Sequence, residues 1–291
     1  MSVPAKAPAR PGVTSATRVF ALLGDPVGHS RSPVIQNEAF GQAEVDGVYV
    51  AMRCRTEDLA SVLRTLALTG GGGNVTLPHK ERAARLLDVP SDAVRRTGAC
   101  NTFWGTGDAV HGDNTDVEGF RRAVKLFLEG EGKTGSLAGA RILLLGAGGA
   151  SRAVLVSLLD EAAGSITLLN RSAERARAVA RRIGGASVRV AEGVESLKDE
   201  RFDLVVNATR LGLSADDPLP LDLGVLESAD AVFDLVYGAA ETPFVRSARE
   251  RGVPAVDGAE MLVQQGAVAF ERWWERPAPI GAMRAALDVG S

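Results

Sequence analysis

The first part of the chain holds polar side chains, clustered beside glycines, that could carry out proton-transfer chemistry. Among them, Lys80, Asp116 and His79 are the residues that can exchange a proton near neutral pH. A ketone reduced by hydride needs a proton delivered to its oxygen, and the reverse reaction needs one removed. We select Lys80 for that step, although an ordinary surface lysine on a helix beginning after Pro78 is the simpler interpretation of the residue.

Hydroxyl and amide side chains surround this candidate in the sequence. Ser30 precedes Ser32 and Pro33, which fit the N-cap and first residue of a helix. Two hydroxyls at a helix N-terminus offer neutral donors for a small carboxylate, but the serines also fit a purely capping role. Other uncharged hydrogen-bonding residues lie beside glycine near strand ends and suit a polyhydroxylated ligand; they fall within the segments 73–80, 98–102 and 112–116.

A glycine turn in the second half has the context of a dinucleotide fingerprint. The segment Arg141-Ile-Leu-Leu-Leu-Gly-Ala-Gly-Gly-Ala-Ser151 is predicted to form a strand, a turn and a helix start. Glycines let the backbone approach a pyrophosphate, whose charge then meets the helix N-terminus. Ser151 stands where a third glycine is usual and is small enough for close packing of the helix.

The end of the following strand indicates which dinucleotide binds. It lies 24 residues after Gly146, where an acidic residue would hold the ribose 2′-hydroxyl of NAD. Here the chain reads Asn170-Arg171-Ser172-Ala173-Glu174-Arg175, and arginine offers fixed paired donors to a 2′-phosphate. NADP is therefore the predicted cofactor, although all the arginines from Arg171 to Arg182 also fit a solvated helix face.

Spacing argues against two other chemistries. The glycines at 70–73 do not form a phosphate P-loop, because no glycine precedes Lys80. His29, His79 and His111 lie 50 and 32 residues apart without helical pairing, so we predict no metal site.

Hydrophobic periodicity predicts the elements that carry these residues. After Arg141, short apolar runs alternate with helical patterns, which specifies a parallel sheet covered by helices on both faces. Strands are expected at 142–145, 166–169, 188–190, 204–206, 232–236 and 253–256, with a buried helix around 153–159 and another at 172–183 whose first turn Ser172 caps.

The preceding part is also predicted to be α/β. Strands are expected at 19–23, 48–52, 74–77 and 99–103, with amphipathic helices at 59–67 and 120–128. We expect the domain boundary near the start of the polar stretch 129–139.

Composition and charge narrow the class of protein. With 291 residues, 45% hydrophobic and 24% charged, the chain is typical of a globular protein with one large or two ordinary domains. Its net charge of −3 gives no overall attraction to nucleic acid or an anionic membrane, so small molecules are the expected partners. No apolar run approaches the ~20 residues that span a bilayer.

Two further features bear on the compartment. Cys54 and Cys100 are 46 residues apart without a CxxC pattern, which fits reduced thiols of a cytosolic protein. Residues 1–18 are expected to form a disordered tail; a transit peptide is the alternative, but prolines interrupt its amphipathic helix.

Taken together, these segments resemble the shikimate dehydrogenase family, NADP-linked enzymes of aromatic amino acid biosynthesis. The motifs HSRSP, NVTLPHKE, GACNT, GDNTD, GAGGAS, NRSAER, NATRLG and DGAEMLVQQG occur in the family's order over about residues 19–275. The resemblance implies reversible reduction of 3-dehydroshikimate to shikimate by a cytoplasmic monomer or homodimer. It also implies two α/β domains: a substrate-binding catalytic domain of residues 19–117 and 259–288, completed by C-terminal helices, and a Rossmann-type doubly wound NADP-binding domain at 118–258. Substrate and cofactor would meet in the cleft between them.

The same resemblance implies a role for each matching residue. Lys80 would transfer the proton, with Asp116 as its partner. The substrate would be bound by Ser30, Ser32 and Tyr237 at its carboxylate and by Thr76, Asn101, Asp116 and Gln265 at its ring hydroxyls. The pyrophosphate would lie on Gly146, Ala147, Gly148, Gly149 and Ala150, and the adenosine phosphate on Asn170, Arg171, Ser172 and Arg175. The nicotinamide would be lined by Leu235, Gly258 and Met261, and Asp92 falls at a further cofactor position.

Some positions depart from the family pattern without removing a proposed catalytic group. Cys100 replaces a usual valine, Ser172 replaces threonine, Arg210 stands where a small polar residue is common, and Gly238-Ala239 replaces an Asn-Pro pair. The last two could alter the cofactor pocket and the loop after Tyr237.

Two other functions remain open from the sequence. A quinate dehydrogenase would share the fold and the Lys80–Asp116 pair, but Ser32 and the arginines after Asn170 favour shikimate and NADP. A catalytically silent ligand sensor would be expected to lose Lys80 or Asp116 or to add a DNA-binding segment, and neither is seen.

Overall fold

The computed structural model describes residues 12–214, 216–238 and 240–288. Most of the predicted tail, residues 1–11, and Ala239 therefore lie outside the described residues. The chain divides into two compact units: unit 1 holds the residues up to Val94, Gly98–Thr115 and those from Gly266 onward, and unit 2 holds Arg95–Thr97 and Asp116–Gln265.

Unit 1 is an α/β unit built on a mixed six-stranded sheet. Its elements are β1 (Arg18–Gly24), α1 (Ser32–Gln42), β2 (Gly47–Arg53), α2 (Leu59–Leu68), β3 (Gly72–Val75), α3 (Lys80–Ala84), β4 (Val89–Pro90), the start of α4 (Asp92–Thr97), β5 (Thr102–Thr106), β6 (Ala109–Asp113), the end of α9 (Ala259–Trp274) and α10 (Ile280–Asp288). The strand order is β2-β1-β3-β5-β6-β4. Strands β1, β2 and β3 pair in parallel, whereas β5 pairs antiparallel with both β3 and β6.

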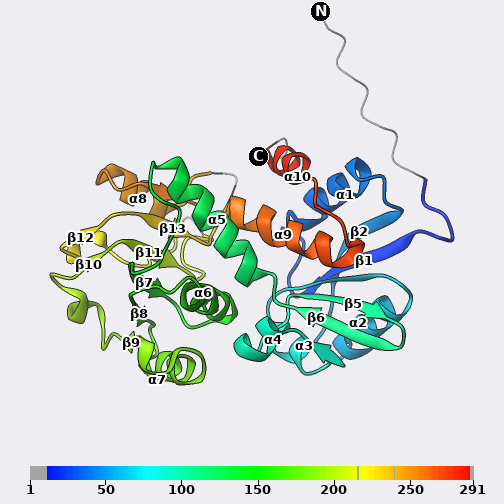
Figure 1. The fold of residues 1–291 in the computed structure, drawn as a ribbon, viewed down its shortest axis with the longest axis horizontal. Helices are drawn as coiled ribbons and strands as arrows, with labels where there is room; N and C mark the ends of the chain where they lie inside the picture. Colours follow the sequence, from blue (N-terminus) through cyan, green and yellow to red (C-terminus); the bar gives the residue numbers. More distant parts are fainter. Residues whose placement is uncertain (1–11, 215, 239, 289–291) are drawn as a thin grey trace, which may run out of the picture. The chain divides into compact units, whose positions relative to one another are not determined.

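The two faces of this sheet bury different side chains. Aliphatic residues of β1 and β3 pack against α2 on one face, where Leu59, Leu63 and Ala67 form the predicted apolar stripe. On the other face Phe20 and Phe40 pack against the tryptophans of α9, with ring centroids of Phe20 and Trp273 4.8 Å apart. Helices thus cover both faces of the sheet (Figure 1).

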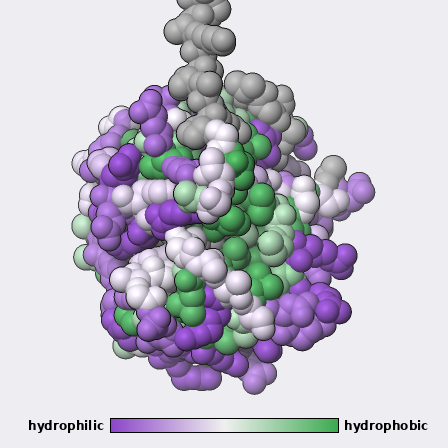
Figure 2. Space-filling model, turned by 90° about the vertical axis from the view of Figure 1, so that its right-hand side faces the viewer, coloured by the Kyte–Doolittle hydropathy of each residue, from purple (hydrophilic) through white to green (hydrophobic). Residues whose placement is uncertain are grey.

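The surface of unit 1 also carries exposed apolar side chains. Val19, Val50 and Leu68 are 38–40% exposed, and β2 forms the edge of the sheet. Figure 2 shows one face of the molecule, on which apolar residues gather into a strip between hydrophilic flanks.

Unit 2 is built on a six-stranded sheet whose strands are all parallel, in the order β14-β13-β11-β7-β8-β9. Its elements are the end of α4, α5 (Asp116–Gly130), β7 (Arg141–Leu145), α6 (Gly149–Asp160), β8 (Ser165–Leu169), α7 (Ala173–Val179), a π-helical turn (Ala180–Gly184), 3₁₀ turns at Gly185–Ser187, Val194–Leu197 and Leu223–Val225, β9 (Val188–Val190), β11 (Leu204–Asn207), β13 (Val232–Asp234), α8 (Pro243–Glu250), β14 (Ala255–Val256) and the start of α9. A two-stranded parallel ladder of β10 (Arg201–Phe202) and β12 (Ser228–Ala229) adds to it.

Alternation along β7 explains why helices lie on both faces of this sheet. Ile142 and Leu144 enter a core with α5, α6 and α7, whereas Leu143 and Leu145 enter a second core with α8. Successive side chains of a strand point to opposite faces, so an uninterrupted apolar strand must be covered twice. The predicted doubly wound parallel sheet is confirmed.

Several predicted element bounds need correction. The strand predicted at 74–77 is Gly72–Val75; a Cβ at Gly72 would lie 2.4 Å from the Phe103 carbonyl oxygen, so glycine permits the approach of β5. The strand predicted at 99–103 begins only at Thr102, because the Cys100 amide bonds to the Lys80 carbonyl of α3 and not to a neighbouring strand.

The remaining differences lie at element ends and at the division between units. The helix predicted at 172–183 is α-helical only to Val179, and the strands at 232–236 and 253–256 are shorter, ending at Asp234 and beginning at Ala255. Strand β1 starts at Arg18, inside the predicted tail. Residues 259–288 are predicted to belong to the substrate domain together with 19–117; in the structure unit 2 extends to Gln265, and unit 1 resumes at Gly266 inside α9.

Across the part of the chain that the structure describes, no helix combines the length and the apolar character needed to cross a membrane.

The aromatic packing of unit 2 makes a stability prediction. Phe233 is fully buried in β13, and its ring contacts Phe120 edge to face at 5.4 Å. Phe233→Ala should lower the free energy of unfolding by about 3–5 kcal/mol, because it removes a large side chain from a packed core. Leu126→Ala, at a 44% exposed position, should cost less than about 0.5 kcal/mol. Denaturant unfolding measures both; equal losses would contradict this packing.

Candidate functional site

The predicted dinucleotide turn connects β7 to α6. Gly146 has a φ of +106°, and a Cβ there would lie 3.0 Å from the Ala208 carbonyl oxygen, so both conformation and space require glycine. A Cβ built on Gly148 meets no heavy atom of the described chain within 4 Å, which leaves room above the turn for a ligand. The Gly148 N–H donates to Ser151 Oγ at 3.2 Å, and the first amides of α6 suit a pyrophosphate.

The segment after β8 contacts this turn through one arginine. Ser172 caps α7 as predicted, because its Oγ accepts from the Arg175 N–H at 3.3 Å. Arg175 Nε donates to the Ala147 carbonyl at 3.0 Å, and Asn170 Nδ2 donates to the Ser172 carbonyl at 2.9 Å. Arg171 is exposed beside them. The structure thus brings the two predicted phosphate-binding segments together at one edge of the sheet.

The predicted nicotinamide residues follow β13 and β14. The Leu235 N–H donates to the Asn207 carbonyl at 2.9 Å, and the Gly258 N–H donates to the Val236 carbonyl at 3.0 Å. A Cβ on Gly258 would lie 2.2 Å from the Leu235 carbonyl oxygen, so only glycine permits this approach. Met261 is 7% exposed and packs into the apolar core of unit 2. Leu235 and Gly258 therefore lie side by side, with Met261 beneath the surface.

Unit 1 contains a buried network of uncharged polar side chains. The Tyr49 hydroxyl donates to Asn74 Oδ1 at 2.7 Å, and burial raises the pKa of this phenol, which keeps it protonated. Asn74 Nδ2 donates to the Asn101 carbonyl and to Thr102 Oγ1, at 3.1 and 2.9 Å. Asn101 Oδ1 in turn accepts from the Thr115 N–H at 2.7 Å, which orients the Asn101 amide.

The two predicted carboxylate-binding serines lie together, but Ser32 does not cap the helix. Helix α1 begins at Ser32, and Arg31 occupies the N-cap without a side-chain bond. The Ser32 N–H donates to Ser30 Oγ at 3.2 Å, and the two hydroxyl oxygens are also 3.2 Å apart. The capping prediction for Ser32 is therefore wrong, because Ser30 supplies the acceptor for this amide.

Lys80 begins the short helix α3 and is half-buried. Its carbonyl accepts from the Cys100 N–H at 2.9 Å. The preceding His79 is 1% exposed, and its Nε2 lies 2.7 Å from the Cys54 carbonyl oxygen. Thr76, also half-buried, follows β3 four residues earlier. One backbone bond and one side-chain bond, each to a different loop, thus anchor the segment that carries Lys80.

The remaining predicted residues divide between the units. Asp116, 6% exposed, is the first residue of α5 in unit 2, whereas Asp92 begins α4 in unit 1. A Cβ on Gly119 would lie 2.6 Å from Gln265 Cβ, so α5 touches α9 there. Residues three apart share a helix face, which puts Asp116 on the α5 face that meets α9. Tyr237 is half-buried after β13. The pairing of Asp116 with Lys80 of unit 1 stays a prediction.

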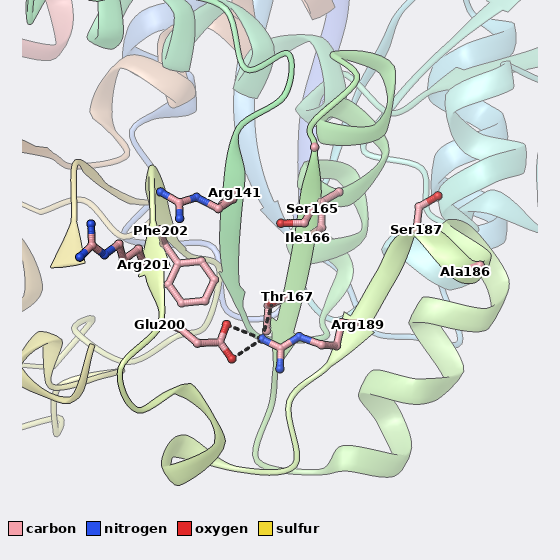
Figure 3. A pocket seen from close by; sticks show the side chains of 11 residues that line it. Arg141, Ser165, Ile166, Thr167, Ala186, Ser187, Arg189, Glu200, Arg201 and Phe202 are labelled. Carbon is pink, nitrogen blue, oxygen red and sulfur yellow. Dashed lines mark hydrogen bonds and ion pairs between the residues drawn. The ribbon is translucent and has the colours of Figure 1, made fainter. Parts of the chain in front are cut away.

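A hollow of about 350 Å³ lies at the opposite, amino-terminal edge of the unit 2 sheet (Figure 3). It is lined where β7, β8 and β9 begin, and its arginines have acidic partners: Arg141 pairs with Asp203, Arg189 with Glu200 and Arg201 with Glu227. Ligands of open α/β sheets bind outside the carboxyl ends of the strands. This rule favours the other edge of the sheet for the predicted dinucleotide site.

Comparisons with known proteins match the chain in three segments. Residues 22–103 match the shikimate dehydrogenase substrate binding domain, 129–212 match shikimate / quinate 5-dehydrogenase, and 258–287 match the shikimate 5′-dehydrogenase C-terminal domain. The shikimate dehydrogenase (NADP(+)) of Moorella thermoacetica is 40% identical over 281 residues, which cover 93% of this chain and 92% of the relative. The chain belongs to the shikimate dehydrogenase family.

Solved structures of shikimate dehydrogenases have the same fold. The enzyme from Aquifex aeolicus superposes with a TM-score of 0.85 at 32% identity, over 95% of this chain and 99% of that one. The enzyme from Thermus thermophilus, solved in complex with NADP(H) and shikimate, gives a TM-score of 0.83 at 34% identity, over 94% of this chain and 99% of that one.

The departures from the family pattern lie in different surroundings. Cys100 is fully buried, its Sγ donates to the Thr102 carbonyl, and burial raises its pKa to about 12, so the thiol is part of the core. Arg210 and Gly238 are exposed, and Ala239 lies outside the described residues.

Sequence reasoning missed several buried residues whose hydrogen bonds hold the segments that carry predicted site residues. Tyr49 lies in an apolar strand and carries no signal of its partnership with Asn74. Asp234, at the end of β13, is buried and accepts a hydrogen bond from the buried Thr242 hydroxyl at 2.7 Å. Only Tyr237 was predicted from this part of the sequence, although an acid inside an apolar run is a signal of a buried, hydrogen-bonded carboxyl group.

The Tyr49–Asn74 bond makes a second stability prediction. Tyr49→Phe keeps the ring but leaves Asn74 Oδ1 without this donor, so it should cost about 1–3 kcal/mol of unfolding free energy. The exposed Thr69 hydroxyl donates to the Thr65 carbonyl, and Thr69→Val should cost less than about 0.5 kcal/mol. Thermal and denaturant unfolding of the two variants measure these losses of stability. An unchanged stability of Tyr49→Phe would argue against the buried network.

Proposed function

We propose that the protein catalyses the reversible, NADPH-dependent reduction of 3-dehydroshikimate to shikimate, in the chorismate pathway to aromatic amino acids. The observation that carries this function is the family match, which runs in order through the substrate-binding, central and C-terminal segments. The same reaction is named for a relative 40% identical over nearly the whole chain. Unit 1 would bind the substrate, and unit 2 would bind the cofactor.

NADP fits the carboxyl edge of the unit 2 sheet. The open space at Gly148 and the first amides of α6 would receive the pyrophosphate, and Arg171, Ser172 and Arg175 would receive the 2′-phosphate. Leu235, beside Gly258, would border the nicotinamide. When bound, the cofactor supplies the hydride that reduces the ketone, or accepts it in the reverse direction.

The residues of the first segment would bind the polyhydroxylated ring. The paired hydroxyls of Ser30 and Ser32 suit the carboxylate, with Tyr237 as a further donor, because hydroxyls 3.2 Å apart can donate to the two oxygens of one group. Hydroxyls of the ring would bond to Asn101, whose amide is oriented by its partners, and to Thr76, Asp116 and Gln265.

Lys80 would carry the proton. In reduction its ammonium donates a proton to the carbonyl oxygen that becomes the alcohol, and in oxidation its amine takes that proton back. Asp116 would orient Lys80 and stabilise its charged form. Because the substrate oxygen receives its proton as the carbon receives hydride, loss of Lys80 should slow the chemical step more than it weakens binding.

The finer assignments are also proposals. We propose a cytoplasmic monomer or homodimer with small-molecule substrates and no nucleic acid or membrane partner. Quinate, whose ring carries one more hydroxyl, is the competing substrate.

Reduction of NADP and of NAD, followed spectrophotometrically with shikimate and with quinate, tests the proposed function: fast turnover should require shikimate and NADP together.

Replacement of Lys80 tests the proton-transfer role. Lys80→Ala should lower kcat for shikimate oxidation by about 10²–10⁴-fold, because general acid–base catalysis contributes that much. Lys125→Ala, an exposed position on α5, should leave kcat unchanged. Steady-state kinetics with both substrates varied gives kcat and KM separately, and turnover preserved in Lys80→Ala would remove Lys80 from the mechanism.

Replacement of Arg171 tests the cofactor preference. Arg171→Ala should raise KM for NADP by about tenfold or more, because the 2′-phosphate loses a charged partner. KM for NAD should stay within about twofold, because NAD has no 2′-phosphate. Arg181→Ala, an exposed arginine in the turn after α7, serves as the matched control. Equal weakening of NADP and NAD in Arg171→Ala would refute the phosphate pocket.

A further inference from the structure

Asp234, the last residue of β13, is a carboxylate with no exposed surface. The donors recorded for it in the described chain are all uncharged: Asn207 Nδ2 and the Val236 N–H at Oδ1, at 2.8 and 3.0 Å, and Thr242 Oγ1 at Oδ2, at 2.7 Å. Burial raises the pKa of Asp234, and the nearby Asp257 adds to the effect. An acid buried without a cation is costly, so its place in the fold calls for a reason beyond stability.

The bonds of Asp234 organise two loops at once. Asp234 and Asn207 are register partners at the carboxyl ends of adjacent parallel strands, β13 and β11. Asn207 shapes the loop after β11, because its Oδ1 accepts from both the N–H and the hydroxyl of Thr209. Asp234 also bonds to two described residues that follow β13: the Val236 amide and the hydroxyl of Thr242, which caps α8.

The loop after β13 lies where one half of a dinucleotide is expected. A Rossmann-type sheet binds its cofactor across the switch point at the first strand, one nucleotide half on each side. In unit 2 that strand is β7, and the residues suited to the 2′-phosphate follow β8 on one side of it. The other half, which carries the nicotinamide, therefore falls over β11 and β13.

We propose that Asp234 is a positioning residue for the nicotinamide half of the cofactor. It does not touch the cofactor; through Asn207, Val236 and Thr242 it holds the backbone of Leu235, whose N–H bonds to Asn207 and whose carbonyl lies against Gly258. This inference rests on the proposed function for the identity of the cofactor.

The test separates the two halves of the cofactor. The ligands are NADP⁺ and 2′,5′-ADP, which shares the adenosine and 2′-phosphate groups but lacks the nicotinamide half, and calorimetry gives Kd for each. Asp234→Ala should weaken NADP⁺ about tenfold and change 2′,5′-ADP by less than about twofold. It should also lower kcat by about 10–100-fold, because misplacement of a reacting group is costly.

Two further variants test whether the hydrogen bonds of Asp234 are the cause of the weaker NADP⁺ binding. Asp234→Asn should stay within about threefold of the unaltered protein in kcat and in Kd for NADP⁺, because one amide oxygen can keep the Asn207 and Val236 bonds and the Thr242 hydroxyl can turn to accept from the amide nitrogen. Asp203→Ala removes an aspartate from the opposite edge of the same sheet, where it holds the Arg141 N–H. It should lower the melting temperature without changing the ratio of the two Kd values.

Equal weakening of NADP⁺ and 2′,5′-ADP in Asp234→Ala, or a lowered melting temperature with an unchanged Kd ratio and kcat, would overturn the proposal. If Asp234→Ala fails to fold, Thr242→Val removes the bond at Oδ2 together with the α8 cap bond from the Val245 N–H, and it should shift the Kd ratio in the same direction; an unchanged ratio there would overturn the proposal too. Absence of shikimate turnover in the unaltered protein would instead reject the proposed function, and the Kd ratio would still decide the role of Asp234.

Discussion

The parallel register of four strands is the constraint on which the chemistry of unit 2 depends. Leu145 pairs with Leu169 and with Asn207, and Asn207 pairs with Asp234, so β7, β8, β11 and β13 end level with one another. The glycine turn, the arginine segment and the loop after β13 then begin at the same edge, although they are far apart in the chain. Parallel strands require crossovers, and the helices that make them leave this edge open to a ligand.

In unit 1 the polar side chains are held in place by hydrogen bonds to one another. Its buried amides and hydroxyls are uncharged and largely satisfy one another, as in the chain from Tyr49 through Asn74 to Asn101. Interior hydrogen bonds of this kind rigidify the side chains that take part, because leaving any one of them unmade is expensive. A ring carrying several hydroxyls needs donors and acceptors held in fixed directions, and such a network supplies them with little reorganisation on binding.

Much of unit 2 could be predicted from the sequence because its signals are local. The apolar run before Gly146 and the hydroxyl of Ser172 predict a strand and a helix cap from neighbouring residues alone. Unit 1 was harder. Its third strand contains Gly72 and Gly73, which have low strand propensity and are present because neighbouring strands approach closely. The partnership of Asp113 with Arg272, 159 residues away, has no local signal at all. Interactions between residues close in the chain can be predicted from a single sequence, whereas pairings made only by the tertiary fold cannot.

The bond from Arg175 to the carbonyl of Ala147 connects the two segments that we propose to bind the phosphates of the cofactor. A preference for NAD would call for an acid in place of the basic residues after the second strand. Such an exchange at Arg175 would also remove its hydrogen bond to the glycine turn, so in the proposed site a change of cofactor preference would come with weaker binding of the pyrophosphate. Retaining that guanidinium and altering its neighbour is the route that leaves the turn intact.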